Sequence, residues 1–239
     1  MRGASLPGSI SLSLTGCFEL RVGGSRVPVP HSVERLIAYL GLCPTPVSRG
    51  RLAGVLWPET TQQRASNNLR TSLWRLHITQ AHVVTASENR LSIAPDVAVD
   101  VRDLLSLSGR LIAAADPECR HSARVLASHV EVLPDWDDVW VVAERERFRL
   151  LRLEALEGAA TAMLDQGWSS DALSMALDLV RSEPLRESAW RVVVRAHIAQ
   201  GNLAEALRAY HRYRWMLEEE LGVSPSPLML ALVADLRIR

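Results

Sequence analysis

The sequence predicts a mainly α-helical protein with a small β component in its first part. Apolar residues recur at three- and four-residue steps through most of the chain, whereas short alternating segments fall within residues 10–30 and 82–93. A 34-residue repeat runs through the second part. Charge divides in the same way, because residues 1–95 contain 10 Arg and 4 Glu, whereas residues 96–239 contain 17 Arg and 23 acids. A basic first part beside an acidic second part suggests that a polyanion binds at the N-terminal end.

Residues 10–95 are predicted to form a winged helix-turn-helix, after a disordered tail at residues 1–9. The elements expected in order are a small sheet or hairpin within 10–30, helices over 33–40, 48–57 and 61–77, and a β-hairpin over 82–93. Ser32 and Ser48 are expected to cap the first two helices. In this order of elements, two helices present the third helix and the hairpin flanks it as a wing.

The third helical segment, Thr61–His77, has the pattern of a DNA recognition helix. Ala65, Leu69, Leu73 and Leu76 form one narrow apolar stripe. The rest of the segment carries Arg, Asn and Thr but no carboxylate. Arg can bond guanine bidentately, Asn can do the same for adenine, and Thr can contact a thymine methyl group.

Nine residues are candidates for DNA contact, eight of them in this segment. They are Arg64, Asn67, Asn68, Arg70, Thr71, Trp74, Arg75, His77 and, beside the hairpin tip, Arg90. We expect Thr71 and Arg75 to meet bases, and Arg64 and Arg70 to meet phosphates. The alternative for the segment is an ordinary solvated amphipathic helix, and Arg90 has the corresponding alternative of a solvated hairpin charge. Trp74 either faces DNA or seals a contact with the second domain.

The composition argues against several classes of enzyme. All 27 basic residues are Arg, so the chain has neither the Lys of a P-loop nor a Schiff-base Lys. The three cysteines are far apart, and no HExxH or GxSxG motif occurs. We therefore expect no catalytic residue, metal or cofactor. The sequence also contains no apparent signal peptide and no apolar run long enough to span a membrane, so a cytoplasmic, nucleoid-associated protein without a membrane partner is expected.

Residues 96–239 are predicted to form an all-α domain with tetratricopeptide-like (TPR-like) repeats. Helical leucine spacing covers 101–115, 119–130 and 139–166. The pairs related by 34 residues are Leu156 and Trp190, Ala160 and Val194, Leu164 and Ile198, Gly167 and Gly201, Ala172 and Ala206, and Ala176 and Tyr210. The tryptophans expected in the core rather than around a ligand are Trp57, Trp136, Trp140, Trp168, Trp190 and Trp215.

Several motifs resemble those of the Streptomyces antibiotic regulatory proteins (SARP), a family of transcription activators. In the first part these are GCFEL at 16–20, PVSRGRLAGVLWPE at 46–59 and NLRTSLWRL at 68–76, and in the second part ALRAYHRYR and LEEELGVSPSP. The resemblance implies an OmpR-type winged helix followed by a bacterial transcriptional activation domain, with Arg70, Thr71 and Arg75 toward the DNA. Two positions depart from the family pattern. Glu88-Asn89 replaces the usual Gly-Tyr before Arg90, and His77 stands where the family usually has Arg.

The resemblance also implies a function. The protein would bind direct repeats in double-stranded promoter DNA of secondary-metabolite (antibiotic) biosynthesis genes, with a second protomer on the tandem repeat. It would recruit the RNA polymerase holoenzyme, including its sigma factor. The sequence leaves two alternatives open: a TPR-type protein-binding adaptor, and a ligand-responsive regulator without direct activation.

Overall fold

The structure is a computed structural model that describes residues 9–79, 81–113, 118–128 and 131–234. Apart from Ser9, the predicted N-terminal tail lies outside the described residues, as does the end of the helix predicted over 119–130. The chain divides into two compact units, Met1–Ser106 with His129–Arg149, and Leu107–Ser128 with Leu150–Arg239. The units are therefore interleaved along the chain, whereas the sequence predicted two consecutive domains at 10–95 and 96–239.

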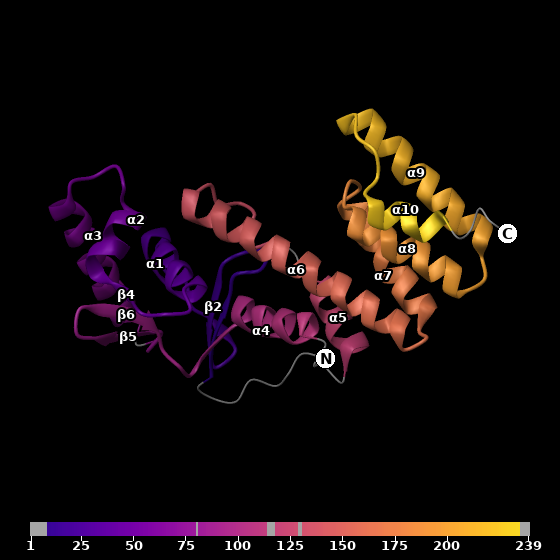
Figure 1. Ribbon diagram of the computed structural model, residues 1–239. Helices are drawn as coiled ribbons and strands as arrows, with labels where there is room; N and C mark the ends of the chain where they lie inside the picture. Colours follow the sequence, from indigo (N-terminus) through magenta and orange to yellow (C-terminus); the bar gives the residue numbers. More distant parts are fainter. Residues whose placement is uncertain (1–8, 80, 114–117, 129–130, 235–239) are drawn as a thin grey trace. The chain divides into compact units, whose positions relative to one another are not determined.

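Unit 1 contains two small sheets and the three predicted helices. The first sheet has the strand order β3-β2-β1-β7, formed by Ser25–Arg26, Glu19–Val22, Ile10–Ser13 and Val97–Val99. The second has the order β4-β6-β5, formed by Val47–Ser48, Arg90–Ile93 and Val84–Ser87. Because β7 pairs with β1 in parallel, the first sheet extends past residue 95. Figure 1 shows the three helices α1, α2 and α3 beside these strands.

The helices of unit 1 are α1 (His31–Leu42), α2 (Arg49–Leu56) and α3 (Gln62–Ile78). Ser48 caps α2 as predicted, because its hydroxyl accepts the Arg51 N–H at 3.4 Å. The prediction for Ser32 is wrong: α1 begins at His31, two residues before the start that a Ser32 cap would give, with Pro30 at the N-cap and no side-chain cap. Proline suits a helix start because its fixed φ is already helical and it has no N–H to satisfy.

The core of unit 1 joins the first sheet to the helices. Leu12, Leu14 and Leu20 are almost fully buried, as are Leu36 and Ile37 on α1. Residues after the winged helix complete the unit. Leu133 N–H donates to the Leu14 carbonyl at 2.9 Å, and the start of helix α6 (Val139–Asp165) belongs to unit 1.

An aromatic cluster fastens this later segment to the winged helix. Trp136 stacks on Phe18 at 6.1 Å between ring centroids and meets His31 edge-on at 4.9 Å. Trp140 meets Tyr39 edge-on at 5.2 Å. Aromatic pairs in these geometries contribute about 0.5–1.5 kcal/mol each beyond the area they bury. The cluster thus explains why residues near 136–140 form part of unit 1.

Unit 2 is helical in its described residues. Its helices are the end of α4 (Asp100–Ile112), α5 (Cys119–Ala127), most of α6, α7 (Ser169–Ser182), α8 (Glu187–Ala199), α9 (Leu203–Leu221) and α10 (Pro227–Ala234). Figure 1 shows α7, α8 and α9 as successive neighbours. The pair α6–α7 and the pair α8–α9 are the two predicted repeats.

The repeat is visible in the backbone hydrogen bonds of the two turns. Gly167 N–H donates to Leu164 and Trp168 N–H to Met163, at 2.9 and 2.8 Å. The residues 34 positions later repeat both bonds, each at 2.9 Å: Gly201 to Ile198 and Asn202 to His197. Both glycines have positive φ, +81° and +75°. The helix-to-helix turns of the two repeats therefore have the same Schellman-type geometry.

We predict that Gly167→Ala or Gly201→Ala lowers the stability of unit 2 by about 1 kcal/mol, because an L side chain is strained at positive φ. A Cβ at either position would meet no heavy atom within 4 Å, so backbone strain is the only penalty. Gly109→Ala is the matched control, since this exposed helical glycine has the same open surroundings without a positive φ. It should raise stability. Thermal unfolding of the three variants checks the opposite signs.

The tryptophans differ in their exposure, so the prediction that all are core residues is wrong in part. Trp190 is buried, and its indole N–H donates to the Pro184 carbonyl at 2.7 Å. Trp57, Trp136 and Trp140 are half-buried. Trp168 and Trp215, by contrast, are exposed, at 37% and 66%.

Candidate nucleic-acid interface

Helix α3 is held in unit 1 by one narrow buried face. Ala65, Leu69, Ser72 and Leu76 are buried, and the helix packs on α1 and α2. The predicted stripe contained Leu73 in place of Ser72, and this part of the prediction is wrong. At about 100° per residue, Ser72 falls within 20° of Ala65 whereas Leu73 falls 80° away. Leu73 is accordingly half-buried at the edge of the contact.

The opposite face of α3 carries the predicted DNA-contacting side chains. Arg64, Asn67, Arg70, Thr71, Trp74, Arg75 and His77 are exposed, and Asn68 is half-buried. Within this set, Arg64, Asn68, Thr71 and Arg75 follow steps of four, three and four residues, so they form one stripe along the helix. Trp74 is 63% exposed on the adjoining side. Eight of the nine candidates therefore come together on one helix.

The arginines of this face have few partners within the described part of the protein. Arg64 and Arg75 have no ion pair or hydrogen bond through their guanidinium groups among the described residues. Arg70 donates only a long 3.5 Å hydrogen bond to the side-chain oxygen of Asn67. The hydroxyl of Thr71 donates to the Asn67 carbonyl at 3.0 Å, while its methyl group remains available for an apolar contact.

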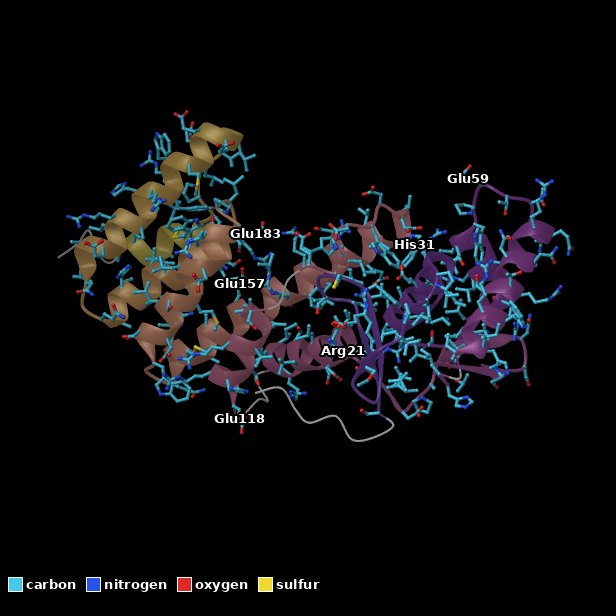
Figure 2. All side chains as sticks on the ribbon, turned by 180° about the vertical axis from the view of Figure 1, so that it is seen from behind. Arg21, His31, Glu59, Glu118, Glu157 and Glu183 are labelled. Carbon is cyan, nitrogen blue, oxygen red and sulfur yellow. The ribbon has the colours of Figure 1, made fainter. Side chains whose placement is uncertain are left out.

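The local electrostatics of α3 favour an anion. Thr61 caps the helix by accepting the Arg64 N–H at 3.4 Å, and the first turn contains no acidic residue. The partial positive charge of the helix N-terminus is therefore not offset there. Between residues 48 and 78 the chain contains five Arg and a single acid, Glu59, which Figure 2 shows on the loop between α2 and α3.

The wing has the predicted hairpin but little basic charge at its tip. Strands β5 and β6 are joined by the two-residue turn Glu88–Asn89, with Glu88 at φ 53°. Arg90 is exposed, but its guanidinium donates to the Pro46 carbonyl at 3.1 Å. The structure therefore separates Arg90 from the other eight candidates and directs it toward the loop before β4.

Two further polar residues are candidates for DNA contact, although sequence reasoning omitted them. Gln63 is exposed in the first turn of α3, the end of a recognition helix that meets base edges in helix-turn-helix proteins. Arg49 begins α2, and its N–H donates to the Asn89 carbonyl of the wing turn at 3.0 Å. The signal for both was the position of a polar residue within two residues after an N-cap, Thr61 for Gln63 and Ser48 for Arg49.

Other arginines of unit 1 have structural partners and are poor candidates for DNA contact. Arg102 donates to the carbonyls of Leu40, Gly41 and Cys43 at 2.7–2.9 Å, which satisfies the C-terminal end of α1. Burial lowers the pKa of Arg102 below its ordinary value. Arg35 pairs with Asp138.

The described residues show neither a membrane-crossing helix nor a metal site. No helix among them combines the length and apolar character needed to cross a bilayer. Groups of three or more His, Cys, Asp or Glu side chains placed to hold a metal ion are also absent from the part of the chain that the structure describes.

Comparison with known proteins agrees with this architecture. The family model of the bacterial transcriptional activator domain matches residues 121–237. The transcriptional regulatory protein MoaR1 of Mycobacterium bovis is 25% identical over 96% of this chain and 79% of its own length. The regulatory protein AfsR of Streptomyces coelicolor is 31% identical over 74% of this chain, which corresponds to 19% of AfsR.

A solved structure shows the same fold. Mycobacterium tuberculosis EmbR, determined in complex with a low-affinity phosphopeptide, superposes with a TM-score of 0.79 at 21% sequence identity. The match covers 97% of this chain and 66% of the EmbR chain. The OmpR-type winged helix and the TPR-like helical domain predicted from the sequence are thereby confirmed. With its winged helix and its bacterial transcriptional activator domain, the chain belongs to the SARP-type transcription activators.

Proposed function

We propose that the protein binds double-stranded promoter DNA with α3 in the major groove. The observation that carries this proposal is the exposed, acid-free face of α3, where Arg64 and Arg75 have no partner among the described residues. A protein-binding adaptor would have no need of an accessible face with unpaired guanidinium groups. Thr71 and Arg75 are assigned to bases, and Arg64 and Arg70 to phosphates.

The remaining candidates have supporting roles in this proposal. Asn67 and Asn68 can read adenine, and His77 and Trp74 extend the contact toward the C-terminal end of α3. Arg49, at the start of α2, and Gln63 are added to the surface. Arg90 contributes through the wing only if its hydrogen bond to Pro46 is exchanged for a phosphate contact.

The finer function rests on the family. We propose that the protein activates secondary-metabolite (antibiotic) biosynthesis genes from direct repeats in their promoters and recruits the RNA polymerase holoenzyme through its sigma factor. Direct repeats place two protomers head to tail, so the second protomer would be held through a heterologous contact. A cytoplasmic, nucleoid-associated location follows from this role.

The test is a fluorescence-anisotropy titration with promoter fragments of the neighbouring gene cluster. We predict a steep salt dependence, because each neutralised phosphate releases counterions. Four phosphate contacts would reduce the affinity by roughly 10²-fold between 50 and 200 mM salt. The titration should compare fragments with one repeat, two direct repeats and two inverted repeats. We expect the fragment with two direct repeats to bind with the highest affinity.

Two outcomes would contradict the proposal. Absence of binding to every promoter fragment at 50 mM salt would remove DNA as the partner. Equal affinity for direct and inverted pairs would retain DNA binding but reject the head-to-tail arrangement of protomers.

A further inference from the structure

Unit 2 contains a cavity that DNA binding leaves without a role. It has a volume of about 410 Å³ and lies among α5, the second half of α6, and α7. All its lining residues belong to unit 2. A volume of this size falls within the range of roughly 300–1,000 Å³ that is typical of small-molecule sites.

The lining carries more positive than negative charge. It contains four guanidinium groups and two carboxylates, from Arg120, Arg124, Arg152, Arg181, Asp171 and Asp178. Asp171 forms ion pairs with two of the arginines, Arg120 and, at 3.3 Å, Arg124. The hydrogen bond from Arg120 is the main reason that the pKa of Asp171 is lowered, so this carboxylate is charged. Asp178 pairs with Arg181 at 3.1 Å.

Arg152 has no carboxylate partner among the described residues. Its guanidinium donates to the carbonyls of Leu126 and Ala127 at 2.9 and 2.8 Å, at the C-terminal end of α5. The partial negative charge of that helix end offsets only part of a full positive charge. Burial lowers the pKa of Arg152, which shows that its charge is partly removed from water. With Asp171 shared, the lining therefore has two guanidinium charges in excess.

The rest of the cavity wall is apolar. Leu156, Met163 and Leu179 are buried in it, and Met175 is half-buried. Methionine side chains adapt to ligands of different shape because they are unbranched and polarisable. The wall thus combines an apolar floor with exposed guanidinium groups of Arg124 and Arg181.

We propose that this cavity binds a small organic acid, with its carboxylate between the arginines and its apolar part against the methionines. The carboxylate would add the negative charge that Arg152 lacks and that Arg120 and Arg124 have to share, and the guanidinium fork favours a planar anion. The apolar part would displace water from Met163, Met175 and Leu156. The lining of this cavity shares no residue with the DNA surface on α3, so the proposal of an acid-binding cavity and the proposal of DNA binding can be rejected separately.

Methyl NMR of the full chain labelled at methionine tests the proposal directly. The chain has five Met, so each signal can be assigned from single Met→Leu variants. The probe is 1-naphthoate, and 1-naphthalenemethanol is its uncharged counterpart. We expect 1-naphthoate to shift the Met163 and Met175 signals in a saturable way. Met216, which lines a different cavity, and the fully buried Met229 should not shift.

Variants separate charge from packing. Arg124→Gln and Arg181→Gln change exposed side chains at the rim and should together weaken 1-naphthoate binding about fivefold or more. Arg214→Gln is the matched control, because this exposed arginine on α9 lies outside the lining. Unchanged melting temperatures would show that all three variants remain folded.

Three outcomes would overturn the proposal. The first is the absence of Met163 and Met175 shifts at millimolar 1-naphthoate. The second is equal binding of the uncharged alcohol, which would make the site simply apolar. The third is that a synthetic peptide of alternating Glu and Leu shifts these signals while 1-naphthoate does not, which would make the surface a peptide-docking site.

Discussion

Replacing Arg75 by Ala is expected to weaken binding to a specific promoter by about 1–3 kcal/mol, or roughly 5- to 150-fold. Arg75 is exposed on α3, on the same stripe as Thr71 and Arg64. Because its guanidinium has no partner among the described residues, it can form a bidentate pair with guanine without breaking an existing ion pair. Loss of that pair should also relax the preference for one base. Anisotropy titrations with the promoter sequence and with single-base variants measure both effects.

The control for Arg75→Ala is Arg26→Ala. Arg26 is an exposed arginine of unit 1. It lies on β3, in the four-stranded sheet that does not contain the wing. The two variants remove the same charge, so any long-range electrostatic loss is common to both. If Arg75→Ala reduces affinity equally on all sequences, Arg75 contacts a phosphate and its assignment to a base is wrong. If it matches Arg26→Ala, α3 is not the recognition helix.

Sequence periodicity was sufficient to predict the three helices and the wing hairpin of unit 1, because each has its own apolar pattern and turn signals, but it did not predict the short strands β4 and β7. Its limits appear at single residues. Ser72 is buried in place of Leu73 because the direction of the contact decides burial at the edge of a stripe, and hydrophobicity alone does not specify that direction. Ser32 was a suitable N-cap, yet Pro30 allowed α1 to begin earlier.

The interleaving of the two units depends on long-range contacts that no local pattern contains. In the sequence, Trp136 and Trp140 are only two aromatic residues near the start of a helix. The structure shows that their rings pack against Phe18, His31 and Tyr39. The 34-residue repeat was easier to predict, because the same Gly positions must reproduce the same turn in both repeats.

The candidate DNA surface was predictable where it lies on one helix and less so where it involves separate elements. Arg64, Thr71 and Arg75 share a face by geometry alone. The orientation of Arg90 toward the Pro46 carbonyl depends on the pairing of β4 with β6, which brings residues 44 positions apart into contact. The number of arginines in the sequence was likewise no guide to which of them contact DNA, because Arg102 and Arg145 use their guanidinium groups to donate to backbone carbonyls.

Replacing Asp100 by Ala is expected to cause the largest loss of stability in unit 1, about 3 kcal/mol or more. Asp100 is the first residue of α4, and its carboxylate accepts the backbone N–H groups of Leu14 and Thr15 at 2.9–3.0 Å. It also accepts the hydroxyls of Ser13 at 2.7 Å and Thr15 at 2.6 Å. Alanine would leave these donors at the end of β1 without their acceptor. Thermal unfolding should show a decrease in melting temperature of roughly 6–12 °C.

Asp103→Ala is the matched control, because Asp103 has the same charge in the same first turn of α4 but is exposed. Both variants lose the favourable interaction of a carboxylate with the helix N-terminus, about 0.3–1 kcal/mol, so the difference between them isolates the hydrogen bonds to β1. Asp100→Asn should also be destabilising, since its NH₂ group would face backbone donors. None of these partners lies on α3, so DNA affinity measured well below the melting temperature should stay close to that of the unsubstituted protein. Equal stability of Asp100→Ala and Asp103→Ala would show that Asp100 acts only through its charge and that the bonds to Leu14 and Thr15 contribute nothing to the fold.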